Sequence, residues 1–322
     1  MKFKLKKISG DASFRQFYRL KAGRKKTIIV KSNKEKFRNL ITYSIINRFL
    51  QKRGILTPKL FNEFFKNGMM EIEDFGDISL GKYLKKKRNK YHFYKKIVEL
   101  LLKIQKIKAK SLIGSYKNHN IYLDLYNRKN LHKESDLFFD WYLPGVIGQK
   151  KTKEYKFLIR RELDIIYKKL YFKNTYLVHR DFHVSNLMFF KNKIGLIDTQ
   201  DAIIGNPAYD LVSLIDDVRI ETSVSLKKEI FNYYLSKTSK VFKKEKNNFT
   251  NDFNILSIQR NLKILGIFYR LFKRDKKNQY LKFIPYTWKL IELRIKNSMF
   301  DNLELLLNKA VNKKLRKKNL LK

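Results

Sequence analysis

The sequence predicts an α+β fold with a small β-rich N-terminal lobe and a larger, mainly helical C-terminal lobe. In residues 1–76, apolar and polar side chains alternate in short runs separated by glycines, a pattern typical of a small sheet. From about residue 80 onward, apolar side chains recur at spacings of three and four, which is the period of amphipathic helices. We therefore expect one lobe at residues 1–76 and a second at residues 77–322.

Residues 37–54 interrupt the strand pattern of the N-terminal lobe with a helical one. Their apolar side chains follow the helical period, and Gly54 marks the expected end of that helix. In the C-terminal lobe two short strand-like segments, TYLVH at 175–179 and KIGLID at 193–198, flank a polar stretch. We expect these two segments to form a short hairpin.

The composition describes a folded, strongly basic chain. Apolar residues make up 43% of the 322 residues, which excludes a disordered protein, and the formal net charge is +44. Such a charge suits a nucleic acid or an anionic membrane surface as partner. The lysines, however, are spread along nearly every segment, so a lysine-rich solvated surface is the simpler interpretation, and we expect no dedicated nucleic-acid partner.

Cysteine usage and hydropathy exclude two further classes of protein. With no cysteine the chain has neither disulfides nor thiolate metal sites, so it is not a disulfide-stapled secreted domain. No stretch of about 18 apolar residues occurs, and the charged N-terminus lacks the apolar core of a signal peptide. We expect no membrane span and a cytoplasmic location.

The stretch LVHRDFHVSNLMFF at 177–190 contains the residues that indicate catalysis. Asp181 is followed five positions later by Asn186, and Asp198 comes after the apolar pair at the end of the next strand-like segment. Phosphoryl transfer needs a group that holds and deprotonates the attacking hydroxyl, together with oxygen ligands for Mg²⁺. Asp181 suits the first role, and Asn186 and Asp198 suit the second.

Each of these residues taken singly also has a structural interpretation. Asp181 is compatible with capping a turn, Asn186 with satisfying a loop backbone, and Asp198 with ending a strand. Together, the H-x-D-x-x-x-x-N spacing and the following apolar-apolar-Asp match the catalytic loop and the metal-binding acid of kinases. The combination favours a catalytic loop.

Residues 177–217 resemble the aminoglycoside phosphotransferase and choline kinase superfamily, which has a protein-kinase-like bilobal fold. GDASFRQFYRL at 10–20, FFDWYLPGVIG at 138–148 and QRNLKILGIF at 259–268 resemble more closely the bacterial cell-wall amino-sugar kinases. Those enzymes use ATP and Mg²⁺ to phosphorylate the anomeric hydroxyl of N-acetylmuramate and N-acetylglucosamine. The resemblance therefore implies formation of a sugar 1-phosphate for peptidoglycan recycling.

The resemblance also implies roles for residues of the loop. Asp181 corresponds to the catalytic base, Asn186 and Asp198 to the metal ligands, His179 to a structural histidine, and Asp210 to an acid that braces the loop.

Three neighbouring positions carry further expectations. Arg180 stands where many aminoglycoside kinases have glycine, which argues against antibiotic modification. Asp201 is either a further metal-facing acid or a capping residue. His183 either contacts substrate or packs inside the loop.

Nucleotide binding is expected in the N-terminal lobe. By resemblance, Ser13 and Arg15 would contact phosphates. Lys31 either pairs with the α- and β-phosphates or is simply a lysine at a strand end. The hinge-like MMEIEDFGD would bind adenine through main-chain groups of residues 71–75, which include Glu71 and Glu73.

The sugar pocket is predicted from two segments of the C-terminal lobe. The ring of Trp141 suits a pyranose face, and Arg260 and Lys263, three positions apart on one helix, suit the carboxylate of muramate. The alternative is core packing for Trp141 and a solvated face for the basic pair.

Two other classes of function stay open from the sequence. One is a kinase for another small alcohol, namely choline, ethanolamine, homoserine or an aminoglycoside. The other is a kinase-like protein that uses its basic surface to bind RNA or acidic lipid.

Overall fold

The computed structural model describes residues 3–8, 15–23, 25–32, 37–108, 111–116 and 119–317. The chain forms two compact units. The first comprises Met1–Asp124 and Tyr176–Ile204, and the second comprises Leu125–Thr175 and Gly205–Lys322. These units divide the chain differently from the predicted boundary at residue 76, because the first unit also holds the predicted catalytic loop. The division into lobes at that residue stays a prediction.

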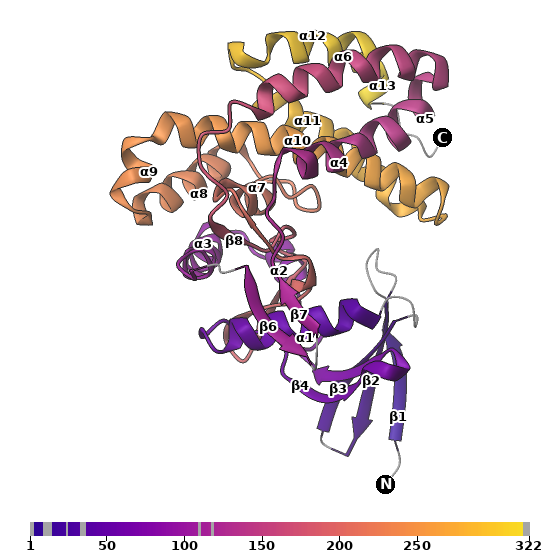
Figure 1. The fold of residues 1–322 in the computed structure, drawn as a ribbon, viewed down its shortest axis with the longest axis vertical. Coiled ribbons are helices and arrows are strands. Elements are labelled where there is room, and N and C mark those ends of the chain that lie inside the picture. The colour runs from indigo at the N-terminus through magenta and orange to yellow at the C-terminus, as the bar shows by residue number, and fades with distance from the viewer. Residues whose placement is uncertain are drawn as a thin grey trace. The chain divides into compact units, whose positions relative to one another are not determined.

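The first unit contains the predicted N-terminal sheet, which is five-stranded and antiparallel (Figure 1). In spatial order its strands are β1 (Phe3–Ile8), β2 (Gln16–Ala22), β3 (Lys25–Lys31), β5 (Met69–Glu73) and β4 (Leu60–Phe64). The turn between β2 and β3 includes Gly23, whose φ of 57° lies in the left-handed region that favours glycine. The β2–β3 register pairs Gln16 with Lys31.

Helix α1 (Phe37–Gln51) packs against this sheet, as the periodicity predicts. Leu40, Ile41 and Tyr43 of the helix form one apolar core with Val30 of β3 and Met70 of β5. The helix is followed by a turn to Gly54, which has a φ of 72°. The two-stranded sheet of β6 (Leu112–Tyr116) and β7 (His119–Tyr122) also contributes side chains to this core.

The strands around the predicted catalytic loop pair differently from the expected hairpin. The antiparallel partner of β10 (Lys193–Leu196) is β9 (Leu187–Phe190), and β8 (Tyr176–Val178) pairs with β11 (Ile203–Gly205). The predicted pairing of 175–179 with 193–198 is therefore wrong. Strand β10 pairs with β9 because Lys191 and Asn192 adopt left-handed φ values of 47° and 60°, which form a tight turn directly after LMFF.

The second unit is helical, and α10 (Lys246–Lys273) is its central element. This helix packs against α4 (Arg128–Leu137), α7 (Ala208–Ile215) and α11 (Ile284–Arg294). Gly266 lets α10 approach α4 closely, because a Cβ at that position would overlap the backbone of Leu137.

The remaining longer helices of the described chain are α2 (Leu80–Lys85) and α3 (Tyr91–Gln105) in the first unit, and α6 (Gln149–Tyr167), α8 (Val224–Lys237) and α12 (Asp301–Ala310) in the second. Across the described ranges, none of the helices combines the length and the apolar character that crossing a bilayer would require.

Candidate active site

The predicted catalytic loop is a compact turn between β8 and β9. The amide of His183 donates to the carbonyl of Asp181 at 2.9 Å, and the amide of Asn186 donates to the carbonyl of His183 at 2.9 Å. Buried His179 forms a hydrogen bond between its Nε2 and the carbonyl of Ile197 at 3.0 Å. Arg180 has a left-handed φ of 72°, so the chain turns sharply immediately before Asp181.

Asn186 contacts the loop with one end of its carboxamide. Its Nδ2 donates to the carbonyl of Asp181 at 3.0 Å, which fixes the orientation of the side chain. The amide oxygen is then directed away from that bond, and it accepts no hydrogen bond from the described part of the chain. An oriented amide oxygen of this kind suits a hard cation.

Backbone pairing brings Asn186 and Asp198 to adjacent positions. The amide of Ile197 donates to the carbonyl of Asn186 at 3.0 Å, which extends the β9–β10 ladder by one residue. Asp198 follows at once, in a left-handed conformation with φ 65° and ψ 44°. The hydroxyl of Thr199 donates to Asn47 Oδ1 of α1 at 2.7 Å, which holds the segment after Asp198 against that helix.

Arg15 is the cation beside Asp198. Its guanidinium contacts Asp198 Oδ1 and donates to Gln200 Oε1 at 3.0 Å, although 183 residues separate Arg15 from Asp198. The arginine is only 7% exposed and lies near the rings of Phe17 and Tyr43, whereas the Asp198 side chain is 37% exposed. The arrangement joins a buried cation to an accessible carboxylate.

Gln200 completes this cluster and was not anticipated from the sequence. Its Nε2 donates to Asp198 Oδ1 at 3.1 Å and to Asp201 Oδ2 at 2.8 Å. Asp201 thus contacts Gln200 directly. In the sequence DTQDA, Gln200 stands between Asp198 and Asp201, and this placement is the local signal that it could donate to both carboxylates.

The other predicted phosphate contacts have different outcomes. Ser13 lies outside the described residues. Lys31 is exposed at the end of β3, and no ion pair joins it to an acid within the described ranges. Helix α1 contains no acidic residue at all, so it offers Lys31 no carboxylate partner. Arg15, and not Lys31, is the cation next to the predicted metal ligand.

The predicted hinge follows β5 directly. Glu71 lies inside the sheet, paired with Ile29 and Asn62, and its Oε2 accepts from Asn62 Nδ2 at 2.5 Å. The amide of Glu73 donates to the carbonyl of Lys59 at 2.8 Å. The sheet therefore uses the amide of Glu73, whereas residues 74 and 75 follow the end of β5.

An ion-pair cluster fixes the hinge to the sheet. Arg19 of β2 donates to Asp74 at 2.5 and 3.0 Å and to Asp77 at 2.8 Å. The hydrogen bond from Arg19 lowers the pKa of the Asp77 carboxyl. Asp74 Oδ1 also accepts from the amide of Gly76 at 2.8 Å.

Phe75 links the hinge to the strands of the catalytic loop. Its buried ring stacks on Phe190 of β9, with ring centroids 4.6 Å apart. Gly195 of β10 lies against the same ring. A Cβ at this position would be only 2.5 Å from Phe75 Cε2, so the close contact requires glycine.

The donor set around Asp198 fits a sparsely coordinated Mg²⁺. Among the described residues there is no group of three or more His, Cys, Asp or Glu that could hold a metal ion. Mg²⁺ in phosphotransferases usually takes one or two protein oxygen ligands and completes its shell with phosphates and water. Asp198 and the oriented oxygen of Asn186 meet that requirement.

The predicted sugar-contact residues Trp141, Arg260 and Lys263 belong to the second unit. Trp141 is partly exposed on a π-helical turn, Phe138–Tyr142, a distortion common at functional sites. Arg260 is 3% exposed, and Lys263 Nζ pairs with Glu134 Oε1 at 3.0 Å in a mostly buried pair. The alternative of a solvated face for this basic pair is therefore wrong.

The predicted supporting residue Asp210 and the predicted substrate contact His183 are both buried. Asp210, in α7 of the second unit, is fully buried. His183 is also buried, and its backbone shapes the catalytic loop.

The fold and the loop define a small-molecule phosphotransferase of the protein-kinase-like class. Residues 4–243 match the model of the phosphotransferase enzyme family, and the chain therefore belongs to that family.

Relatives found by sequence include two proteins named N-acetylmuramate/N-acetylglucosamine kinase. The one from Neisseria meningitidis serogroup B is 24% identical over 88% of this chain and 83% of its own length. The one from Pseudomonas aeruginosa is 25% identical over 89% and 82%.

Solved structures with the same fold are more distant in sequence. Aminoglycoside phosphotransferase APH(2'')-Ib in its ADP-bound form has a TM-score of 0.60 at 14% identity, with 92% of this chain and 94% of that chain covered. A choline/ethanolamine kinase family protein from Mesorhizobium loti has a TM-score of 0.61 at 12% identity, with 95% and 92% covered. These likenesses confirm the predicted protein-kinase-like α+β fold.

Proposed function

We propose that the protein is an ATP-dependent kinase that phosphorylates the anomeric hydroxyl of a cell-wall amino sugar, N-acetylmuramate or N-acetylglucosamine. The observation that carries the proposal is the adjacency of Asn186 and Asp198 beside the Asp181 loop, through the backbone bond between Ile197 and Asn186. The names of the sequence relatives support the amino sugar as acceptor. A cytoplasmic location and a role in peptidoglycan recycling belong to the same proposal.

In this proposal the first unit supplies the phosphoryl-transfer residues. Main-chain groups of residues 74 and 75 bind adenine, Arg15 contacts the phosphates, and Asn186 and Asp198 hold Mg²⁺. Mg²⁺, when bound, neutralises negative charge on the phosphates. The carboxylate of Asp181 orients the sugar hydroxyl toward the γ-phosphorus and accepts its proton as the new bond forms.

The chemistry asks for positioning more than for a strong base. An anomeric hydroxyl is more acidic than an ordinary alcohol, so alignment and charge neutralisation contribute most of the barrier reduction. A catalytic role based on alignment agrees with the position of Asp181, which is partly exposed in a loop held by backbone hydrogen bonds of 2.9 Å.

Phosphorus NMR tests the proposal. The full chain with ATP, Mg²⁺ and N-acetylmuramate or N-acetylglucosamine should give a new phosphomonoester signal, coupled to the anomeric proton, and Asp181→Asn should slow its appearance about 10²-fold or more. A parallel panel contains choline, ethanolamine, homoserine and an aminoglycoside. Turnover of one of these without turnover of either amino sugar would reassign the acceptor. Salt-sensitive RNA or lipid binding without any ATP turnover would reject the kinase assignment.

A further inference from the structure

Gln200 is a buried residue beside the predicted metal site that the proposed mechanism does not use. It lies in a short 3₁₀ turn, Thr199–Asp201, and is 8% exposed. Its Oε1 accepts from Arg15 Nη1 at 3.0 Å, and its Nε2 donates to Asp198 Oδ1 at 3.1 Å and to Asp201 Oδ2 at 2.8 Å. The side chain therefore joins one cation to two acids.

A carboxamide suits these three neighbours. The guanidinium of Arg15 can only donate, and ionised carboxylates can only accept. The amide offers an oxygen to the guanidinium and its two N–H hydrogens to the acids, so the neighbours also determine which end of the amide is oxygen. A glutamate of the same length would place a third negative charge beside Asp198 and Asp201.

The two oxygens of the Asp198 carboxylate have different surroundings. Arg15 and Gln200 both contact Oδ1, whereas Oδ2 accepts no hydrogen bond from any residue that the structure describes. The side chain of Asp198 is 37% exposed. One oxygen is therefore held by the protein, and the other is open to a ligand.

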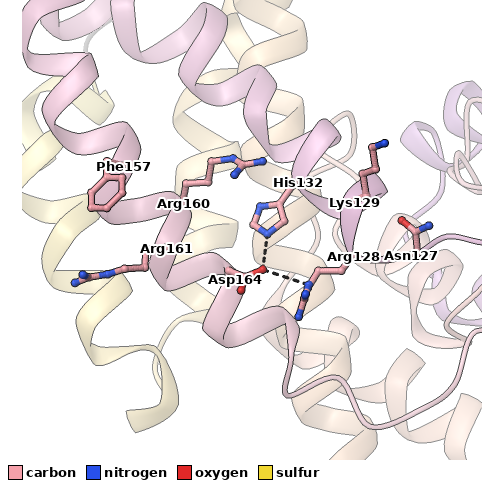
Figure 2. A pocket seen from close by; sticks show the side chains of 8 residues that line it. All are labelled: Asn127, Arg128, Lys129, His132, Phe157, Arg160, Arg161 and Asp164. Atoms are coloured by element: carbon pink, nitrogen blue, oxygen red, sulfur yellow. Dashed lines mark hydrogen bonds and ion pairs between the residues drawn. The ribbon is translucent and has the colours of Figure 1, made fainter.

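Asp164 of α6 shows the contrasting case of a fully paired carboxylate. Its Oδ1 contacts His132 Nε2 at 2.9 Å and Arg128 Nε at 3.3 Å, and its Oδ2 contacts Lys168 Nζ at 2.9 Å. Figure 2 shows this carboxylate between His132 and Arg128. Both of its oxygens thus have basic partners, and the open Oδ2 distinguishes Asp198 from such a structural ion pair.

The backbone turn around Gln200 is held by other groups. The hydroxyl of Thr199 donates to Asn47 Oδ1 at 2.7 Å, and the amide of Ala202 donates to the carbonyl of Thr199 at 3.1 Å. Neither bond involves the Gln200 side chain. Loss of that side chain should therefore leave the turn in place and let the Asp198 carboxylate change its rotamer.

We propose that Gln200 is a positioning residue for the divalent cation of phosphoryl transfer. Its amide holds Asp198 by Oδ1 and leaves Oδ2 available to the cation. Once Arg15 contacts phosphates, the bond from Gln200 is the one that remains on Oδ1. The kinetic part of this inference rests on the proposed function, whereas the metal-binding part is measured without nucleotide or sugar.

Electron paramagnetic resonance of free Mn²⁺ tests the inference on the full chain. Gln200→Met keeps the length of the side chain and removes its three hydrogen bonds. Because hydrogen-bond partners of metal ligands typically contribute about 10- to 100-fold to metal affinity, we expect Mn²⁺ binding about tenfold weaker or more. The same loss should appear when Gln200→Met is added to Arg15→Ala, where the guanidinium is absent.

Gln51→Met is the matched control. Gln51 belongs to the same unit, and its Nε2 donates to the carbonyls of Thr57 and Pro58 at 2.9 and 3.1 Å, away from Asp198. The substitution removes a carboxamide in the same way and should leave Mn²⁺ binding unchanged. Equal weakening in Gln51→Met, or wild-type Mn²⁺ affinity in Gln200→Met, would overturn the inference.

The dependence of turnover on Mg²⁺ separates positioning from a general loss of structure. With ATP and N-acetylmuramate saturating, the free Mg²⁺ concentration for half-maximal rate should rise about tenfold in Gln200→Met, and excess Mg²⁺ should restore most of kcat. A kcat that stays low at every Mg²⁺ concentration would show a structural role and overturn the inference.

A second variant and a second outcome complete the test. If Gln200→Met does not fold, Gln200→Asn replaces it, because the shorter carboxamide keeps a polar group in the turn without spanning Arg15 and both acids. The same weakening of Mn²⁺ binding is expected. A chain that phosphorylates neither amino sugar, yet loses Mn²⁺ affinity on Gln200→Met, would reject the proposed acceptor and support the positioning role of Gln200.

Discussion

The Arg15 guanidinium and the Asp198 carboxylate form an ion pair at the predicted metal site. Gln200 contacts both partners, so Asp198 Oδ1 accepts two hydrogen bonds. A buried arginine that is already bonded to the predicted metal ligand would compete with a cation for the same carboxylate. The phosphates of a nucleotide would give this guanidinium a second anion, and Asp198 would then be released toward Mg²⁺. We therefore predict that Arg15 connects nucleotide binding with metal binding.

Replacing Arg15 should separate these two binding events. We expect Arg15→Ala to raise the KM for ATP about tenfold, because one charge-assisted contact contributes about 1.5–3 kcal/mol. The same change should strengthen the binding of Mn²⁺ in the absence of nucleotide, measured by electron paramagnetic resonance of the free ion. Arg48→Ala, which removes a more exposed ion pair with Glu63, is the control. Unchanged Mn²⁺ affinity in Arg15→Ala would refute the competition.

Asp181→Asn should affect turnover and leave nucleotide binding intact. The loop bonds at this position use the Asp181 carbonyl and not its carboxylate, so the substitution preserves the loop. We expect kcat to fall about 10²-fold or more with little change in the KM for ATP. A coupled ADP-release assay measures both constants, with exposed Asp124→Asn as control. A large rise in KM with an unchanged kcat would contradict the role of a base.

Local sequence patterns predicted the parts of the site that are formed locally. Within the loop from His179 to Asn186, the bonds among Asp181, His183 and Asn186 span five residues or fewer, and the spacing of the motif reflects that geometry. Other bonds tie the loop to distant segments, from His179 and Asn186 to Ile197 and from Val184 to Gly81. The periodicity of apolar residues predicted the N-terminal sheet and α1 for the same reason, because strands and helices form from residues close in sequence.

Contacts between distant segments were not predictable in this way. The Arg15–Asp198 pair, the role of Gln200 and the pairing of β8 with β11 join segments that the sequence pattern treats separately. The sequence leaves Lys263 between a sugar contact and a solvated face, and its mostly buried ion pair with Glu134 of α4 joins segments far apart in the chain.

Gly195→Ala should disturb the hinge through Phe75. The new methyl group would lie 2.5 Å from Phe75 Cε2 and would push that ring away from its stack on Phe190. Overpacking of this kind typically costs about 1–3 kcal/mol, so we expect a lower Tm and weaker ATP binding. Phe75→Leu in the same chain makes room for the methyl group, and the double variant should recover part of the loss. Strictly additive effects in thermal unfolding would argue against the contact.

Asp216 is the centre of a buried ion-pair cluster in the second unit. Its carboxylate is paired with Lys227 at 3.1 Å and with Arg294 at 2.8 Å, and it accepts from Ser257 at 2.7 Å. Asp216→Asn would leave a buried cation without its counter-charge, so we expect a loss of about 3–5 kcal/mol in the free energy of unfolding. Asp140→Asn, which removes an exposed pair with Lys156, should cost less than about 1 kcal/mol. Urea unfolding compares the two variants.

The same cluster predicts how the difference between wild type and Asp216→Asn varies with pH. Burial by itself raises the pKa of Asp216, but the charges of Lys227 and Arg294 outweigh it and lower the pKa well below its ordinary value. A carboxyl whose pKa is lower in the folded state stabilises the fold fully above its unfolded pKa of about 3.9, and this stabilisation is lost as the pH falls below that value. The gap in Tm between the two proteins should therefore be constant from pH 7 to about pH 5 and should narrow below about pH 4, where the Asp216 carboxyl of the unfolded wild-type chain begins to bind a proton while that of the folded chain stays ionised. A gap that stays constant down to pH 3 in scanning calorimetry would show that the charge of Asp216 does not stabilise the fold.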